Sequence, residues 1–157
     1  NIGYSIYNTN ELDTLYDKYE IDVVQLPMNI LDRRFEISGW VKRLRNDHKQ
    51  IHARSVFLQG LLLMNREDRP KYFSKWNSLW NEWDEYILNK KTTPLKACLG
   101  YMLEQLNKNN ISNLIVGISC LNNLKEILDF AKSNYTPLKK DFNLEDEEIL
   151  NPSLWRL

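Results

Sequence analysis

Short apolar runs alternate with stretches of helical periodicity along the chain. Four runs with the composition of β-strands cover residues 2–5, 22–27, 50–57 and 113–118. Each is followed by apolar residues three or four positions apart, the spacing of a half-buried helix, as at Leu12, Leu15 and Tyr16. This alternation predicts an α/β fold with parallel strands joined by crossover helices.

The pattern divides the chain into one domain over residues 1–157, built from four strand–helix units and a tail. We place the units at 1–20, 21–47, 49–110 and 112–133, and the tail at 134–157. The first helix is predicted to be capped by Thr9 or Asn10. Pro27 is predicted to end the second strand because it has no N–H to donate.

Helices in the other units follow from the same periodicity. One stripe runs through Ile37, Trp40, Val41 and Leu44, and another through Leu121, Leu124, Ile127, Leu128 and Ala131. The third unit is longer, with a loop after Gly60 and then two helices. The first helix carries an aromatic stripe at Trp76, Trp80 and Trp83, which we interpret as core. The second is predicted to begin at Pro94 with Thr93 as its cap.

The strands read as apolar on both faces, which predicts a sheet covered by helices. Four units fit either a small open doubly wound sheet or half of an eight-stranded barrel, and periodicity does not separate the two. No Gly-x-Gly-x-x-Gly follows the first strand, so the fingerprint of a Rossmann dinucleotide site is absent.

Composition and charge narrow the classes of function. Lys plus Arg equals Asp plus Glu at 21 each, so no bulk charge attracts nucleic acid or an anionic membrane. No apolar run approaches the ~20 residues that cross a bilayer. Cys98 and Cys120 suggest no disulfide framework, and we expect free thiols in a cytoplasmic protein. His48 and His52 have no ligand partners at metal-site spacing, and His52 is expected to be a satisfied core histidine.

The ends of the four strands carry a family resemblance. The segments are GYSIYNTNEL, DVVQLPMNILDRRF, HARSVFLQGLLL and LIVGISCLNNLKEIL. Their order and spacing resemble the last four strands of the aldo/keto reductases. The resemblance implies half of a TIM (β/α)8 barrel, strands five to eight, with an extra helix after the third unit. It also implies NAD(P)H lying across the carboxyl ends of the strands. The family's catalytic Asp, Tyr, Lys and His come from the first four strands, which this chain does not contain, so we expect no catalytic residue here.

Three residues are expected at the nicotinamide end of the cofactor. Ser5 stands where the family has the Ser that holds the carboxamide, although the Asn that follows in the family is Ile6 here. Gln25 offers a neutral amide that can orient the ring without adding charge. Arg54 replaces an aromatic that stacks on the ring, and its alternative role is an ion pair in the barrel mouth.

The resemblance places the rest of the cofactor along two segments. The residues expected at the pyrophosphate are Ser55, Phe57, Gln59 and Gly60. The residues expected at the adenosine end are Gly117, Ser119 and Asn123. Small hydroxyls and main-chain donors suit phosphate oxygens, and a helix start attracts anions. NADP-dependent members of the family usually have a basic residue here for the 2′-phosphate, whereas this sequence has Ser119 and Cys120, with Lys125 as the nearest cation. The resemblance implies NADP, with NAD as the alternative.

The resemblance thus predicts part of an oxidoreductase that reduces a sugar or small carbonyl substrate. This half would contribute cofactor binding. An alternative is a non-catalytic half-barrel that binds nucleotide as a sensor or assembles with a partner, because four parallel strands leave two unpaired edges. The expected partner is the missing N-terminal half or a second copy of the chain. The sequence opens directly on a strand without an initiator Met, as a processed or truncated product would.

Overall fold

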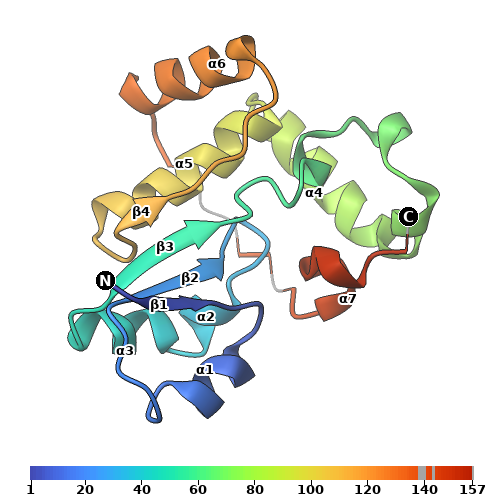
Figure 1. The fold of residues 1–157 in the computed structure, drawn as a ribbon. Coiled ribbons are helices and arrows are strands. Elements are labelled where there is room, and N and C mark those ends of the chain that lie inside the picture. The colour runs from blue at the N-terminus through green and yellow to red at the C-terminus, as the bar shows by residue number, and fades with distance from the viewer. Residues whose placement is uncertain (138–140, 143, 157) are drawn as a thin grey trace.

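The fold is built on one parallel sheet. The computed structural model describes residues 1–137, 141–142 and 144–156. The strands are β1 (Gly3–Ser5), β2 (Val23–Pro27), β3 (Gln50–Arg54) and β4 (Asn113–Leu114). They lie side by side in the order β1-β2-β3-β4, and every pair is parallel (Figure 1). The predicted α/β fold with parallel strands and crossover connections is confirmed.

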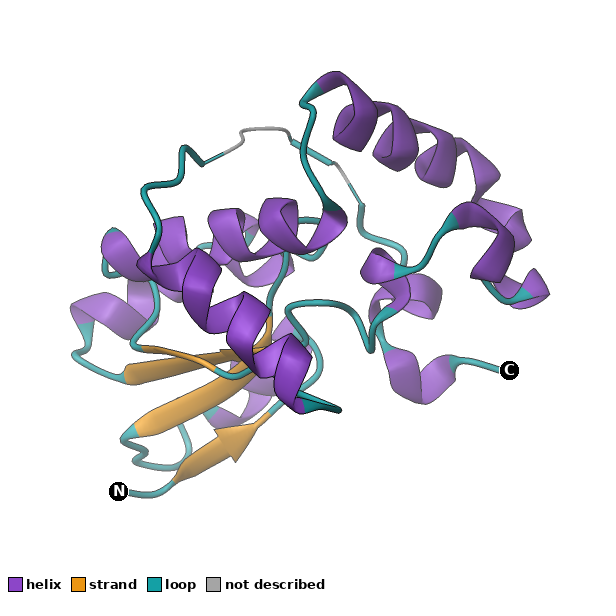
Figure 2. Ribbon diagram, turned by 90° about the horizontal axis from the view of Figure 1, so that it is seen from above, coloured by secondary structure: helices purple, strands orange, loops and turns teal. Residues whose placement is uncertain are grey.

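Seven α-helices and four short 3₁₀ helices accompany the strands in the described residues. The α-helices are α1 (Thr9–Leu15), α2 (Arg34–Ile37), α3 (Trp40–Asn46), α4 (Asn77–Asn89), α5 (Pro94–Asn107), α6 (Leu121–Lys132) and α7 (Glu147–Leu150). The 3₁₀ helices are η1 (Leu61–Leu63), η2 (Arg66–Asp68), η3 (Lys71–Trp76) and η4 (Pro152–Leu154). Figure 2 shows the strands gathered at one side of the molecule, with helices beside them.

Helices cover only one face of the sheet. The buried face carries Val24, Leu26, Ile51 and Ala53. The other face, here called the open face, carries Gly3, Ser5, Val23, Gln25, Gln50, His52, Arg54 and Asn113, all partly or fully exposed. The expectation of strands that are apolar and covered on both faces is therefore wrong for the described residues. Successive strand residues alternate between faces, and the residues on the open face are mostly polar.

Two helix predictions are corrected. Asn8, not Thr9 or Asn10, caps α1, and its Oδ1 accepts from the Glu11 N–H at 3.1 Å. The continuous helix expected from Ile37 to Leu44 is broken into α2 and α3, because Gly39 adopts a left-handed conformation with φ 85°.

Strands β3 and β4 are shorter than their apolar runs. β3 ends at Arg54 because Ser55 turns to a positive φ of 62°. β4 ends at Leu114, and residues 115–118 continue outside the strand. Of the stripe expected to be buried on α6, only Ile127 is buried, and Leu121 is 63% exposed. These shortened strands release the loops that form the candidate site.

Other expectations are confirmed. β2 ends at Pro27, and α5 begins at Pro94 with the Thr93 side chain accepting from the Lys96 N–H at 3.3 Å. The aromatic stripe is confirmed in part: Trp80 and Trp83 are buried in the core. Trp76 lies in η3, before α4, and packs against the core while partly exposed.

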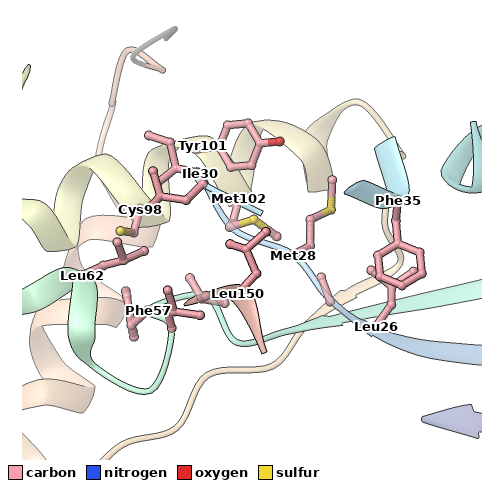
Figure 3. Packing of buried hydrophobic residues seen from close by; sticks show 14 of the residues in the cluster. Leu26, Met28, Ile30, Phe35, Phe57, Leu62, Cys98, Tyr101, Met102 and Leu150 are labelled. Carbon is pink, nitrogen blue, oxygen red and sulfur yellow. The ribbon is translucent and has the colours of Figure 1, made fainter. Parts of the chain in front are cut away.

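The core extends from the sheet to the tail. Figure 3 shows the loop after β2 packing against α5, η1 and α7 through side chains that are almost wholly buried. Its labelled members include Met28, Ile30, Leu62, Met102 and Leu150. The tail is also tied to the aromatic helices, because the rings of Phe73 and Trp155 meet edge to face at 4.8 Å between centroids. α7 and Trp155 are therefore packed as part of the same body as the sheet.

Across the residues that the structure describes, no helix combines the length and apolarity needed to cross a membrane.

Candidate functional site

A groove of about 550 Å³ opens where β3 and β4 end. Its walls are the loop after β3, the segment after β4, one residue each of η1 and α5, and two residues of α6. It is lined by eight of the ten residues singled out from the sequence. They are Arg54, Ser55, Phe57, Gln59, Gly60, Gly117, Ser119 and Asn123. Because parallel strands end at the same edge of a sheet, two segments about 60 residues apart in sequence meet here.

The loop after β3 is held in an unusual backbone conformation. Positive φ angles occur at Ser55 (62°), Leu58 (47°), Gln59 (54°) and Gly60 (85°). Turn hydrogen bonds fix it, from the Leu58 N–H to the Ser55 carbonyl and from the Gly60 N–H to the Phe57 carbonyl, both at 2.9 Å. Non-glycine residues in this region store strain that the surrounding structure must hold, which is common at functional sites.

The residue that holds this loop, Asn29, was not found from the sequence. Its side chain is fully buried, and its Nδ2 donates to the Ser55 carbonyl at 3.0 Å. Its Oδ1 accepts from the N–H groups of Leu31 and Asp32, both at 2.9 Å. One amide thus joins the loop after β2 to the loop after β3. The signal available in the sequence was a lone amide within the apolar stretch after Pro27.

The loop after β2 also holds a buried ion pair. The Arg34 guanidinium donates from Nε and Nη2 to the two Asp32 oxygens, each at 2.9 Å. Asp32 is almost wholly buried. Burial lowers the pKa of Arg34, but its hydrogen bonds to Asp32 and the charges of Asp32 and Glu147 outweigh this and leave the pKa raised. The Asp32 carboxylate is therefore paired with Arg34 away from solvent.

Ser5 and Gln25 form a second cluster, outside the groove. They are register partners at the ends of β1 and β2, and the Ser5 hydroxyl donates to Gln25 Oε1 at 3.2 Å. Both lie on the open face, where a neutral hydroxyl and a neutral amide are accessible.

Arg54 connects this pair to the groove. Its Nη2 donates to the Ile6 carbonyl at 3.0 Å, next to Ser5, and its Nη1 donates to the Ser55 hydroxyl at 3.1 Å. The guanidinium carbon lies 4.6 Å from the centroid of the Tyr7 ring. Over residues 1–137, 141–142 and 144–156, no carboxylate forms a salt bridge with Arg54. The alternative of an ion pair for this residue is therefore not observed in that part of the chain.

The segment after β4 is ordered around Asn123. Its Oδ1 accepts from the Ser119 hydroxyl at 2.8 Å and from the Cys120 thiol at 3.1 Å. Cys120 is the cap residue of α6, and its side chain accepts no hydrogen bond from the first amides of the helix. A Cβ added at Gly117 would meet nothing within 4 Å, so space remains beside this segment. The helix start therefore has donors that remain available to a ligand.

His52 lies on the open face rather than in the core. It is partly exposed, and its Nε2 is 2.8 Å from Asn113 Nδ2 on the neighbouring strand. The expectation of a core histidine is wrong, because its strand phase points it away from the helices. Where the structure describes the chain, no three His, Cys, Asp or Glu side chains are grouped to hold a metal ion.

A larger groove of about 810 Å³ lies on a different face of α6. Four lysines contribute to its lining, namely Lys90, Lys91, Lys96 and Lys125. It is formed by helix ends and residues 133–136, not by strand ends, so we take the 550 Å³ groove as the candidate site.

Comparison with known proteins gives a family and a fold. The sequence model of the aldo/keto reductase family matches residues 1–150. No curated protein matches the chain. An aldo-keto reductase from Bacillus halodurans is similar in its holo form with a TM-score of 0.61, at 17% identity, over 87% of this chain and 45% of that one. Its apo form gives 0.60 at 16% identity, over 97% and 50%. At these identities the likeness shows the fold, and the chain spans about half the length of the structures it matches.

Proposed function

The chain belongs to the aldo/keto reductase family, and on that premise we propose that residues 1–157 form the cofactor-binding part of such an enzyme. In this proposal the four strands are strands five to eight of the barrel. The enzyme reduces a sugar or a small aldehyde or ketone, as expected from the resemblance. The family's catalytic Asp, Tyr, Lys and His are supplied from outside these residues.

The meeting of the two predicted segments in one groove carries this proposal. The segments 55–60 and 117–123, predicted to bind the pyrophosphate and the adenosine, are far apart in the sequence, and both line the same 550 Å³ space. Ser5 and Gln25, predicted to bind the nicotinamide, lie on different strands and are hydrogen-bonded to each other. Arg54 lies between the two clusters. An extended ligand running from the open face into the groove would contact the Ser5–Gln25 pair, Arg54 and the two groove segments.

The chemistry of these groups fits a nicotinamide dinucleotide. A bound cofactor supplies the hydride that goes to the carbonyl carbon. The Gln25 amide both donates and accepts, which suits a carboxamide. In the loop 55–60, the N–H groups of Leu58 and Gly60 are used in turn hydrogen bonds, so the Ser55 hydroxyl and the other main-chain N–H groups are the donors for phosphate oxygens in this proposal. The free amides at the start of α6 suit a phosphate at the adenosine end.

The form of the cofactor follows from the cations nearby. Lys125 lines the neighbouring 810 Å³ groove, one turn of α6 from Asn122. We propose NADP, with its 2′-phosphate attracted by Lys125, and NAD as the alternative. The chain alone would bind cofactor without reducing a carbonyl, because it lacks the general acid that contributes ~10²–10⁴ to the rate.

Calorimetric titration of the full chain with NADPH tests this proposal. We expect saturable binding, weakened about fivefold in Gln25→Met because one neutral hydrogen-bonding group is lost. The matched control is Gln50→Met, which makes the same change on the open face at the opposite ends of the strands. Absence of NADPH binding, or equal loss in both variants, would overturn the proposal.

One observation favours a second candidate, a chain that assembles with a partner. β1 and β4 each have an unpaired edge in the described sheet, and the open face is uncovered. A second copy or a complementary half of the barrel would cover both. This surface is polar, through Ser5, Gln25, His52 and Asn113, rather than apolar. Light scattering with and without NADPH tests self-association: a dimeric mass supports it, and a monomeric mass at all concentrations contradicts it.

A further inference from the structure

Arg54 carries the charge at the strand ends of the candidate site. In the part of the chain that the structure describes, it is the one charged residue that lines the 550 Å³ groove, and Lys125 lies on the neighbouring face of α6. The open face, over the described residues, carries no carboxylate. Among these residues, a ligand between the open face and the groove therefore meets the positive charge of Arg54 and no carboxylate.

Neutral groups alone hold Arg54 in place. Its contacts are the Ile6 carbonyl, the Ser55 hydroxyl and the face of Tyr7. These fix the guanidinium without cancelling its charge, and the side chain is only partly exposed. Its position is beside the carbonyl that follows Ser5, at the end of the site assigned to nicotinamide and not to the adenosine.

Resting on the proposed function, we propose that Arg54 makes this site prefer the reduced nicotinamide cofactor over the oxidised one. The oxidised ring carries a positive charge, and the reduced ring is neutral. Both forms carry the same phosphates, so attraction between Arg54 and the phosphates cancels when the two affinities are compared. What remains is the repulsion between the guanidinium and the oxidised ring.

This preference has a direct consequence for a carbonyl reductase. The reduced cofactor, which enters the reaction, is retained. The oxidised cofactor, which remains after hydride loss, is released more readily. A single like-charge pair at a partly exposed site corresponds to roughly a fivefold difference in affinity. The difference should shrink as salt is added, because exposed charges are screened.

The test is to measure the dissociation constants of NADPH and NADP⁺ for the full chain, at low and at raised ionic strength. We expect NADPH to bind about fivefold more tightly. Arg54→Gln removes the positive charge and keeps a donor toward the Ile6 carbonyl. In this variant the ratio of the two dissociation constants should be about one. Arg54→Lys keeps the charge and should keep the preference.

Lys125→Gln is the matched control, since it removes one positive charge near the adenosine end. This variant should weaken the binding of NADPH and of NADP⁺ equally, and leave the ratio of their dissociation constants unchanged. Equal affinities in the unmodified chain, or an unchanged ratio in Arg54→Gln, would overturn this inference while the proposed cofactor site stands. Failure of both forms to bind would overturn the proposed function and this inference together.

Discussion

Asn29 is the side chain whose loss should do most to loosen the candidate site. It is fully buried and makes three hydrogen bonds, two as acceptor and one as donor. Its partners are the N–H groups of Leu31 and Asp32 and the carbonyl of Ser55. Asn29→Ala removes the amide and with it all three hydrogen bonds, but it leaves the three backbone partner groups in place.

The expected cost follows from the partners left behind. Each buried backbone group without a partner costs about 1–3 kcal/mol, and the Leu31 and Asp32 N–H groups would both be left in this state. The Ser55 carbonyl keeps a partner, because it also accepts from the Leu58 N–H at 2.9 Å. We therefore expect Asn29→Ala to lower the free energy of unfolding by about 3 kcal/mol.

Urea unfolding followed by circular dichroism measures this change. Asn8→Ala is the comparison, because it is the same substitution at a helix cap with one hydrogen bond, expected to cost about 1 kcal/mol. We expect the m-values to be similar, so that the midpoints report stability. If Asn29→Ala lowers the free energy of unfolding no more than Asn8→Ala does, the reasoning that the Asn29 amide holds the loops after β2 and β3 together is refuted.

Three further predictions concern backbone, pH and thiols. Gly60→Ala should cost about 1 kcal/mol of stability because its φ is 85°, whereas Gly117→Ala, with open space and no positive φ, should stay within about 0.5 kcal/mol, as urea midpoints will show. Burial raises the pKa of Tyr86 from 10.0 to about 12, so the unfolded chain loses that proton first and stability should fall between these two pH values. Tyr86→Phe should flatten that fall in urea titrations at graded pH, and an unchanged slope would contradict it. Burial raises the pKa of the Cys98 thiol, so a thiol reagent should label the exposed Cys120 in the native protein and both residues only after unfolding.

The sequence predicted most of what depends on local chemistry. Pro27 and Thr93 marked the end of a strand and the start of a helix because a missing N–H and a capping hydroxyl act within one turn of the chain. The parallel strands joined by crossover helices followed from alternating periodicity, and the groove residues followed from a family resemblance at the strand ends.

What was missed depends on contacts between distant segments. Asn29 matters because its amide meets Ser55, which lies 26 positions away, and no periodic pattern indicates that pairing. The break at Gly39 is a local feature that an unbroken apolar stripe concealed. The polar character of the open face does not show in the composition of such short strands, because successive residues point to opposite faces and the apolar ones dominate each run.

The location of the cofactor site is the central claim, and amide chemical shifts of the isotope-labelled chain during titration with NADPH test it most directly. The account predicts that the largest shifts fall on residues 55–60 and 117–123, with smaller ones at Ser5 and Gln25. Shifts confined to the lysine-lined groove around Lys90, Lys96 and Lys125, or spread without a centre, would contradict it.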